Sequence, residues 1–328
     1  MNTSLYPLKF KPILKNTIWG GNKLRTILNK ESNEDNIGES WELSGVQGDV
    51  SVVSNGFLEG NSLEEIIEIY MGEIVGDPVF NKFDKEFPLL FKFIDATQDL
   101  SIQVHPNDNI ARERHNAYGK TEMWYVIDAE QGSQLISGFN EPSSKEQYLE
   151  AFKKNEITSL LKSHKVERED AFFIPAGEIH AIGAGILLAE IQQTSDVTYR
   201  IYDYNRKDAS GKERELHTDL ALDVIDYKST NDKISYDKND LNETVNIAAC
   251  EYFVTNFLNL TETLLRDVYL LNSFVVYMCT EGSATIICEN GTKESIKKGE
   301  TILVPASIQS IEITPDNSCK LLEVYIKL

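Results

Sequence analysis

Short β-strand-like segments separated by turn residues recur along most of this chain, and this pattern constrains its fold more than any other feature. The clearest segments are 39–43, 89–94, 100–104, 122–127, 171–174 and 186–192. Glycine, asparagine and aspartate lie between them, and such short spacing is typical of β-sandwiches and barrels. We therefore expect a mainly β fold into which a few helices are inserted.

Helical spacing of apolar residues appears in a few places. Ser62 and Glu65 have the spacing of a capping box at the start of an amphipathic run over 62–70. The block 143–163 carries Tyr148 and Phe152 on one side and lysine and glutamate on the other. We expect this block to be a helical insertion in a β domain.

A charged, β-poor stretch at 226–243 divides the chain into two β-rich parts. A length of 328 residues is enough for about two domains of ordinary size. We expect an N-terminal catalytic domain over 1–235, which contains the helical block, and a C-terminal β-barrel domain over 240–328. Within the second part, the Glu-Asn-Gly sequence at 289–291 lies between apolar runs and predicts a hairpin.

The two parts share one weak internal repeat. The segment 170–180 resembles the segment 300–310 when their prolines are aligned, and Ser310 then stands where the first copy has His180. If the two parts are related barrels, only the first has kept its histidine. We therefore expect the chemistry in the N-terminal part and a structural role for the C-terminal barrel.

The charge balance narrows the classes of partner. The chain has 52 acidic and 32 basic residues, a formal net charge of -20, so its field repels nucleic acid and anionic lipid. A phosphorylated ligand would therefore need a local cluster of cations or a metal. The first residues lack a secretory apolar region, and no apolar stretch is long enough to span a bilayer. The four cysteines form no C-x-x-C pair, which indicates reduced thiols in a cytoplasmic protein.

Four residues form a candidate metal site. Gln103 and His105 stand two apart in a strand-like segment, and strand alternation sends both side chains to one face. Glu122 begins the next such segment, and His180 ends the turn pattern Pro-x-Gly-x-x-His. Two imidazoles, one amide oxygen and one carboxylate leave a divalent ion with net positive charge, so that it can act as a Lewis acid.

Seven segments resemble the short bacterial form of the type I mannose-6-phosphate isomerases in order and spacing. They are WGG at 19–21, GESWELS at 38–44, PLLFKFI at 88–94, LSIQVHPND at 100–108, GKTEMW at 119–124, IPAGEIH at 174–180 and EIQQTSDVTYRIYDYNR at 190–206. The resemblance extends over residues 7 to 225, whereas the C-terminal third matches only loosely. It implies cupin-type jelly-roll barrels, two in this chain, with inserted helices.

The resemblance also implies an activity and a cofactor. The members of this family interconvert D-mannose 6-phosphate and D-fructose 6-phosphate through an enediol, with one zinc ion per chain. The family's metal-ligand positions fall on the same four residues, namely Gln103, His105, Glu122 and His180.

Further site residues follow from the resemblance alone. The family's active-site arginine falls on Arg200 and its pocket lysine on Lys120, while Ser101 and Glu190 fall on pocket-lining positions. We expect Arg200, Lys120 and Glu190 to act in catalysis, and Ser101, Lys120 and Arg200 to bind the substrate. The general base is open between Glu190, Lys120 and a metal-bound hydroxide. Glu190 and Arg200 could equally form a structural ion pair at the rim.

Other charged residues are weaker candidates. Lys92 and Arg206 could contact a phosphate, although such residues are more often solvated. The remaining histidines have no partner pattern and are expected at the surface: His115, His164 and His217.

Two rival functions use the same ligands. Two histidines and a carboxylate also describe the iron site of cupin oxygenases, but Gln103, Lys120 and Arg200 fit a redox-inert site for an anionic substrate better. A non-catalytic sugar-binding or regulatory cupin is the second rival, and an eroded site would be its sign. We expect a monomer or weak homodimer that acts on a small-molecule sugar phosphate, with no nucleic-acid or membrane partner.

Overall fold

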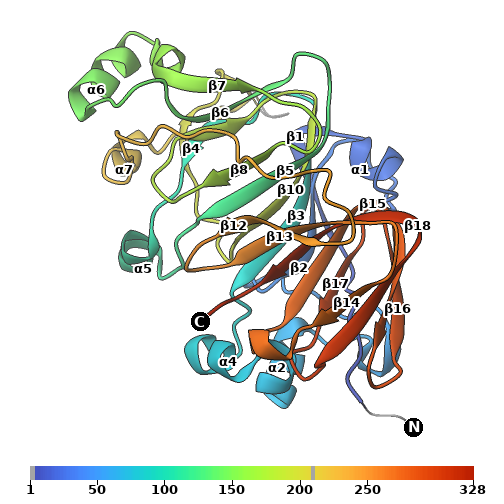
Figure 1. Cartoon of the computed structure of the whole chain (residues 1–328). Helices are drawn as coiled ribbons and strands as arrows, with labels where there is room; N and C mark the ends of the chain where they lie inside the picture. Colours follow the sequence, from blue (N-terminus) through green and yellow to red (C-terminus); the bar gives the residue numbers. More distant parts are fainter. Residues whose placement is uncertain (1–3, 208–210) are drawn as a thin grey trace.

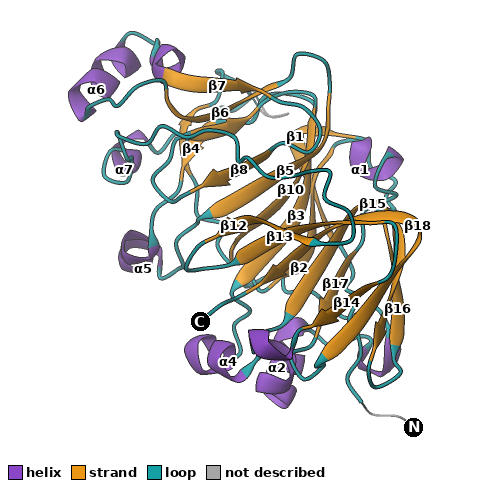
Figure 2. Cartoon of the chain, in the orientation of Figure 1, coloured by secondary structure: helices purple, strands orange, loops and turns teal. Residues whose placement is uncertain are grey.

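Antiparallel strands dominate the computed structural model, which describes residues 4–207 and 211–328. The strands run through the middle of the molecule, and the helices lie at its periphery (Figures 1 and 2). The first sheet has the order β1 (Ile13–Gly21), β2 (Ile37–Ser44), β3 (Leu89–Ala96), β10 (Ile186–Gln193), β5 (Glu122–Ala129), β8 (Ala171–Ile174). The second has the order β11 (Tyr199–Tyr202), β4 (Ile102–Val104), β9 (His180–Ile182), β6 (Gln134–Phe139), β7 (Leu161–Lys165).

The third sheet contains all the strands that follow residue 243. Its order is β12 (Thr244–Ala249), β13 (Val254–Leu260), β18 (Ser310–Tyr325), β15 (Val275–Cys288), β16 (Lys293–Lys297), with β14 (Leu264–Asp267) paired to β18 and β17 (Thr301–Val304) paired to β15. The predicted hairpin at 289–291 is present, because it joins β15 to β16. The mainly β prediction is confirmed. The division at 235 to 240 remains a prediction, and so does the arrangement as two barrels.

The helices are short and occupy the connections between strands. They are α1 (Lys23–Thr26), α2 (Leu63–Tyr70), α3 (Gly72–Val75), α4 (Asp77–Phe83), α5 (Asp108–His115), α6 (Lys145–Lys153) and α7 (Thr218–Ala221), with 3-10 turns η1 (Gly56–Leu58), η2 (Ile157–Leu160) and η3 (Tyr269–Leu271). The capping box before α2 forms as expected, since Ser62 and Glu65 each bond the other's backbone N–H. The block 143–163 holds α6 and η2, but its last residues already belong to β7.

The N-terminal segment is fastened to the C-terminal sheet. Leu8 pairs with Leu303 through two backbone hydrogen bonds, from Leu8 N to Leu303 O at 2.8 Å and in the reverse direction at 2.9 Å. The largest apolar cluster contains both Leu5 and Ile326, and it includes Phe93 of β3. Side chains from both ends of the chain are therefore buried in one core.

The internal repeat has a structural counterpart. In the first copy β8 runs into a turn and then into β9, which begins at His180. In the second copy β17 runs into the corresponding turn and then into β18, which begins at Ser310. Strand and turn states match residue by residue between 170–180 and 300–310. The second copy thus repeats the local structure without the imidazole.

The cysteines and the helices carry two smaller findings. All four cysteines are free thiols, and three of them are buried while Cys250 is partly exposed. No helix among the described residues is long and apolar enough to cross a membrane.

Candidate metal centre and sugar-phosphate site

Neighbouring strands bring the predicted metal ligands together. Gln103 lies on β4 directly opposite His180 on β9, and His105 follows the end of β4. Glu122 opens β5 in the other sheet. The rings of His105 and His180 lie 4.7 Å apart between centroids. Residues separated by about 75 positions in the sequence therefore share one site.

The ligand atoms converge on one point. The Nε2 atoms of His105 and His180 lie 3.1 Å apart. Glu122 Oε2 lies 3.7 Å from His105 Nε2, and Glu122 Oε1 lies 3.5 Å from His180 Nε2. One ligand atom from each of the three residues lies within 4.8 Å of the others, and all three side chains are buried. Three donors at such spacing could hold a metal ion.

Backbone carbonyls orient both imidazoles. Nδ1 of His105 lies 2.9 Å from the Val197 carbonyl oxygen, and Nδ1 of His180 lies 2.8 Å from that of Glu178. Each Nδ1 therefore donates its proton outward, and the Nε2 lone pairs point at the shared centre. Burial lowers the pKa of His180 to about 4 and that of His105 well below its usual value, with Lys120 adding to the effect. Both rings are neutral at pH 7, as metal ligands must be.

The Glu122 carboxylate needs a cation. Both of its oxygens are buried, and neither accepts a hydrogen bond in the described structure. Lys120 Nζ lies 3.3 Å from Oε2, and burial raises the pKa of the carboxyl. A buried carboxylate without hydrogen bonds is costly, so this donor set fits a divalent metal ion.

Gln103 completes the set after a half-turn of its amide. Its Nε2 lies 3.3 Å from His180 Nε2, and rotation of the terminal amide would put Oε1 in that place. An amide oxygen is a ligand for a divalent ion, whereas an amide N–H is not.

A cavity of about 170 Å³ opens beside these ligands. All of the pocket residues expected from the sequence lie around it: Ser101, Gln103, Lys120, Glu190 and Arg200. Lys92, considered above as a possible phosphate contact, lines it too, and so do three charged residues that the sequence analysis did not name: Glu39, Asp196 and Arg214. Lys92, Lys120, Arg200 and Arg214 give this cavity four cations against the three carboxylates of Glu39, Glu190 and Asp196. An acidic chain needs such a local excess of positive charge in order to bind a phosphorylated ligand.

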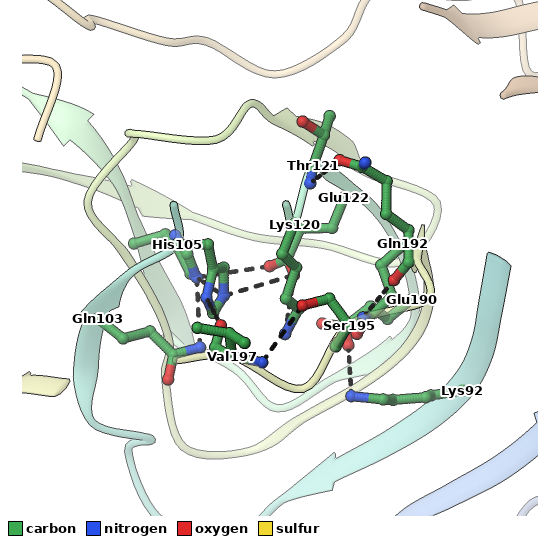
Figure 3. A network of polar contacts seen from close by, with 12 residues as sticks. Lys92, Gln103, His105, Lys120, Thr121, Glu122, Glu190, Gln192, Ser195 and Val197 are labelled. Carbon is green, nitrogen blue, oxygen red and sulfur yellow. Dashed lines mark hydrogen bonds and ion pairs between the residues drawn. The ribbon is translucent and has the colours of Figure 1, made fainter. Parts of the chain in front are cut away.

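Lys92 is buried rather than solvated, which corrects the sequence expectation. Its Nζ lies 3.1 Å from Glu190 Oε1 and 3.4 Å from Glu39 Oε2. Figure 3 shows this contact between Lys92 and Glu190. Trp124 Nε1 donates to the second oxygen of Glu190 at 2.9 Å. Burial by itself would raise the pKa of Glu190, but Lys92 and Lys120 lower it below its usual value. Glu190 is thus held as a carboxylate.

Arg200 does not pair with Glu190, so the rim ion pair considered above is absent. Its Nη1 donates to the Glu215 carbonyl at 2.9 Å, and its Nε is buried without an acceptor in the described structure. Arg200 lines the cavity, so its guanidinium brings a positive charge to that wall.

The remaining histidines differ in how deeply they are buried. His115 is exposed and bonds the hydroxyl of Tyr199 at 2.8 Å, and His217 accepts from the Arg200 backbone N–H. His164 is buried against Phe172, so its expected surface position is wrong. The reason is strand alternation in β7, which turns His164 to the inner face.

Comparison with known proteins agrees with the fold and identifies the family. The family model of the type I phosphomannose isomerase catalytic domain matches residues 7–136. The mannose-6-phosphate isomerase ManA of Bacillus subtilis (strain 168) is 36% identical over 323 residues, which cover 95% of this chain and 97% of the relative. The crystal structure of the mannose 6-phosphate isomerase from Bacillus subtilis matches with a TM-score of 0.88 and 30% identity, over 98% of this chain and 100% of that one.

A more distant structure shares the fold. It is a mannose 6-phosphate isomerase bound with zinc and yttrium, with a TM-score of 0.78 and 18% identity over 99% of this chain and 100% of that one. The cupin-type fold class implied by the sequence resemblance is thereby confirmed. Because a relative of similar length matches over nearly the whole sequence, the chain belongs to the type I phosphomannose isomerases, the enzymes that act as mannose-6-phosphate isomerases.

Proposed function

We propose that this enzyme interconverts D-mannose 6-phosphate and D-fructose 6-phosphate through an enediol at a single zinc site. The proposed ligands are Gln103, His105, Glu122 and His180. The observation that carries the proposal is the buried Glu122 carboxylate, which is ion-paired to Lys120 and faces the Nε2 atoms of two imidazoles beside a cavity lined by lysine and arginine. That zinc is bound in a distant structure of the same fold favours it over other divalent ions.

The isomerisation moves a proton between C1 and C2 of the open-chain sugar, and negative charge develops on the oxygen atoms of these carbons. When bound, zinc supplies a Lewis acid that stabilises this charge. Arg200 adds a permanently charged guanidinium whose Nε has no protein acceptor in the described structure. Ser101 is buried at the cavity wall and offers a hydroxyl to the sugar.

Lys120 and Glu190 are the side chains proposed to move the proton. Both line the cavity and both are buried. Lys92 and Trp124 keep Glu190 ionised and fixed in orientation, but its lowered pKa makes it a weaker base. Glu190→Gln and Lys120→Met separate the two, because the variant that lacks the proton carrier loses the kcat of the metal-loaded enzyme without losing zinc.

The first experiment measures conversion of mannose 6-phosphate to fructose 6-phosphate by purified protein, before and after chelation and again after zinc is added back. We expect turnover that the chelator abolishes and about one equivalent of zinc restores. Metal content is measured on the same samples, and a His105→Ala variant serves as the matched control for the ligand set. A folded, zinc-loaded protein without turnover would overturn the proposal.

A further inference from the structure

Arginine side chains gather where β11 ends. Arg200 lies on β11, Arg206 follows it, and Arg214 returns to the same wall of the cavity. Asp203 lies among them, is buried, and is ion-paired to both Arg206 and Arg214. Three cations thus surround one carboxylate, in a chain whose overall charge is strongly negative.

This wall differs from the other charged wall of the cavity. Lys92 is balanced by Glu190 and Glu39 at 3.1 Å and 3.4 Å. Around Asp203 the cations are in excess, and Arg200 has its pKa lowered by burial and then by the charge of Arg214. Unbalanced positive charge at a cavity wall attracts an anion.

Arg206 and Arg214 differ in how many of their guanidinium nitrogens have protein acceptors. Arg206 donates from Nε to the Asp203 carbonyl at 3.3 Å, from Nη2 to the Asp203 carboxylate and from Nη1 to the Asp99 carbonyl, so all three nitrogens have protein acceptors. Arg214 donates only from Nε, at 2.7 Å, and from Nη2, both to the Asp203 carboxylate. In the described part of the chain Nη1 of Arg214 has no acceptor.

The fork between Arg214 and Asp203 also fixes the plane of the guanidinium. Two parallel N–H donations to one carboxylate hold an arginine in a single orientation. Arg214 lines the same cavity as Lys120 and the proposed metal ligand Gln103. A ligand in this cavity can therefore contact Arg214 as well as Gln103 and Lys120.

We propose that Arg214 binds the phosphate group of the sugar phosphate, and that Asp203 is the positioning residue that aims it. This inference rests on the proposed function, because it assigns one end of the same substrate. A guanidinium suits a phosphate better than an ammonium does, since it offers several donors in a fixed fork.

The test compares Arg214→Gln, Arg214→Lys and Asp203→Asn with the control Arg168→Gln. Arg168 also carries one ion-paired positive charge, to Glu281, but it lies away from the cavity. We expect Arg214→Gln to raise KM for mannose 6-phosphate roughly 10- to 100-fold with kcat nearly unchanged, because uniform binding is lost. The inhibition constant for inorganic phosphate should rise with it. For Arg214→Lys both constants should lie between those of wild type and Arg214→Gln, and the control variant should match wild type.

Asp203→Asn gives the sharper test, because the two explanations for Asp203 predict changes in KM of opposite sign. If only net charge matters, removing a carboxylate strengthens phosphate binding and KM falls. If Asp203 aims Arg214, KM rises although the site has become more positive. A fall in KM would overturn the positioning role.

A second measurement does not depend on turnover. A hexitol 6-phosphate, which carries the phosphate but cannot isomerise, is titrated by calorimetry into wild type and variants. The same loss of affinity in Arg214→Gln, with zinc content and unfolding temperature at wild-type values, supports the assignment. Equal affinity in wild type and Arg214→Gln overturns it. If wild type binds the hexitol phosphate but turns over no mannose 6-phosphate, the proposed reaction fails while the phosphate site stands.

Discussion

Lys92 is the residue whose loss should be most informative about how the cavity is built. It is buried, and Nζ lies between Glu190 and Glu39. Lys92→Met keeps most of the side-chain volume but removes the charge, so Glu190 loses its closest cation in the low-dielectric interior. Breaking a buried pair by removing one partner leaves an uncompensated charge, and this costs far more than an exposed ion pair contributes.

The distance between Lys92 Nζ and Glu190 Oε1 sets the size of the attraction that Lys92→Met removes. At 3.1 Å the pair attracts by about 5 kcal/mol for an effective dielectric constant of ~20. Protonation of Glu190 in the variant and the help of Lys120 offset part of this loss. We therefore expect Lys92→Met to lower the free energy of unfolding by about 3–5 kcal/mol.

Urea unfolding of the zinc-loaded protein, followed by tryptophan fluorescence, measures the effect. A double-mutant cycle with Glu190→Gln isolates the pair, because Gln still accepts from Trp124 but carries no charge. The double variant should be more stable than Lys92→Met alone, with a coupling energy of about 1–3 kcal/mol.

The pH dependence has a definite sign. Without Lys92, burial raises the pKa of Glu190 above that of an unfolded glutamate, so the penalty applies while the group is ionised. The deficit of Lys92→Met relative to wild type should therefore shrink as the pH falls from 7 to 5. A deficit below about 1 kcal/mol at pH 7, or additive effects in the cycle, would refute this account of the cavity.

Three further predictions concern the metal, the pH and the C-terminal sheet. Zinc should stabilise the folded protein by about 1.4 kcal/mol for each tenfold excess over its Kd, and an unfolding midpoint that chelator leaves unchanged would speak against a built-in metal site. Metal-free protein should lose stability as the pH falls below about 6.5, by up to ~1.4 kcal/mol per pH unit per histidine. The reason is that His180, with a pKa lowered to about 4, stays neutral when folded but takes up a proton when unfolded; urea midpoints at pH 7, 6 and 5 check this. Glu323→Leu should cost about 3–5 kcal/mol, because buried Glu323 accepts from Arg266, Tyr277 and Asn256, and the zinc content of the purified variant should stay at one per chain if the two sites are independent.

Three of the four proposed metal ligands have a local signal in the sequence. Gln103 and His105 share a face by strand alternation, and the Pro-x-Gly-x-x-His turn delivers His180. What the sequence does not contain is the register that sets Gln103 opposite His180. That register comes from the pairing of strands far apart in the sequence, which periodicity cannot predict. The family resemblance, by contrast, pointed to the same residues without it.

The roles of Lys92 and Arg214 could not be inferred from the local sequence. The only trace of Lys92 is a single cation within the apolar run 89–94, and its partners come from β2 and β10 on either side. Glu190 is its direct cross-strand neighbour, which no pattern in either strand reveals. Arg214 lies in a connection without periodicity, and Asp203 alone marks its role.

Among the elements, the amphipathic helices α2 and α6 and the apolar strands were predicted, whereas β1 and the single-turn helices were missed. β1 contains Lys15, Asn16 and Thr17 in a half-exposed edge strand, so its pattern is too polar to be recognised. α1, α3 and α7 are single turns fixed by tertiary contacts rather than by propensity.

The pairing of Leu8 with Leu303 has a consequence for how the protein is made. At about 5–20 residues per second, a ribosome needs roughly 15 to 60 s to supply Leu303 after Leu8 has been synthesised. All four proposed zinc ligands precede residue 181, so the metal centre can emerge while the N-terminal segment still lacks its partner strand. During synthesis the nascent chain therefore exposes Leu5 and Leu8, and these are the positions where a chaperone that recognises apolar segments would bind before the last sheet is complete.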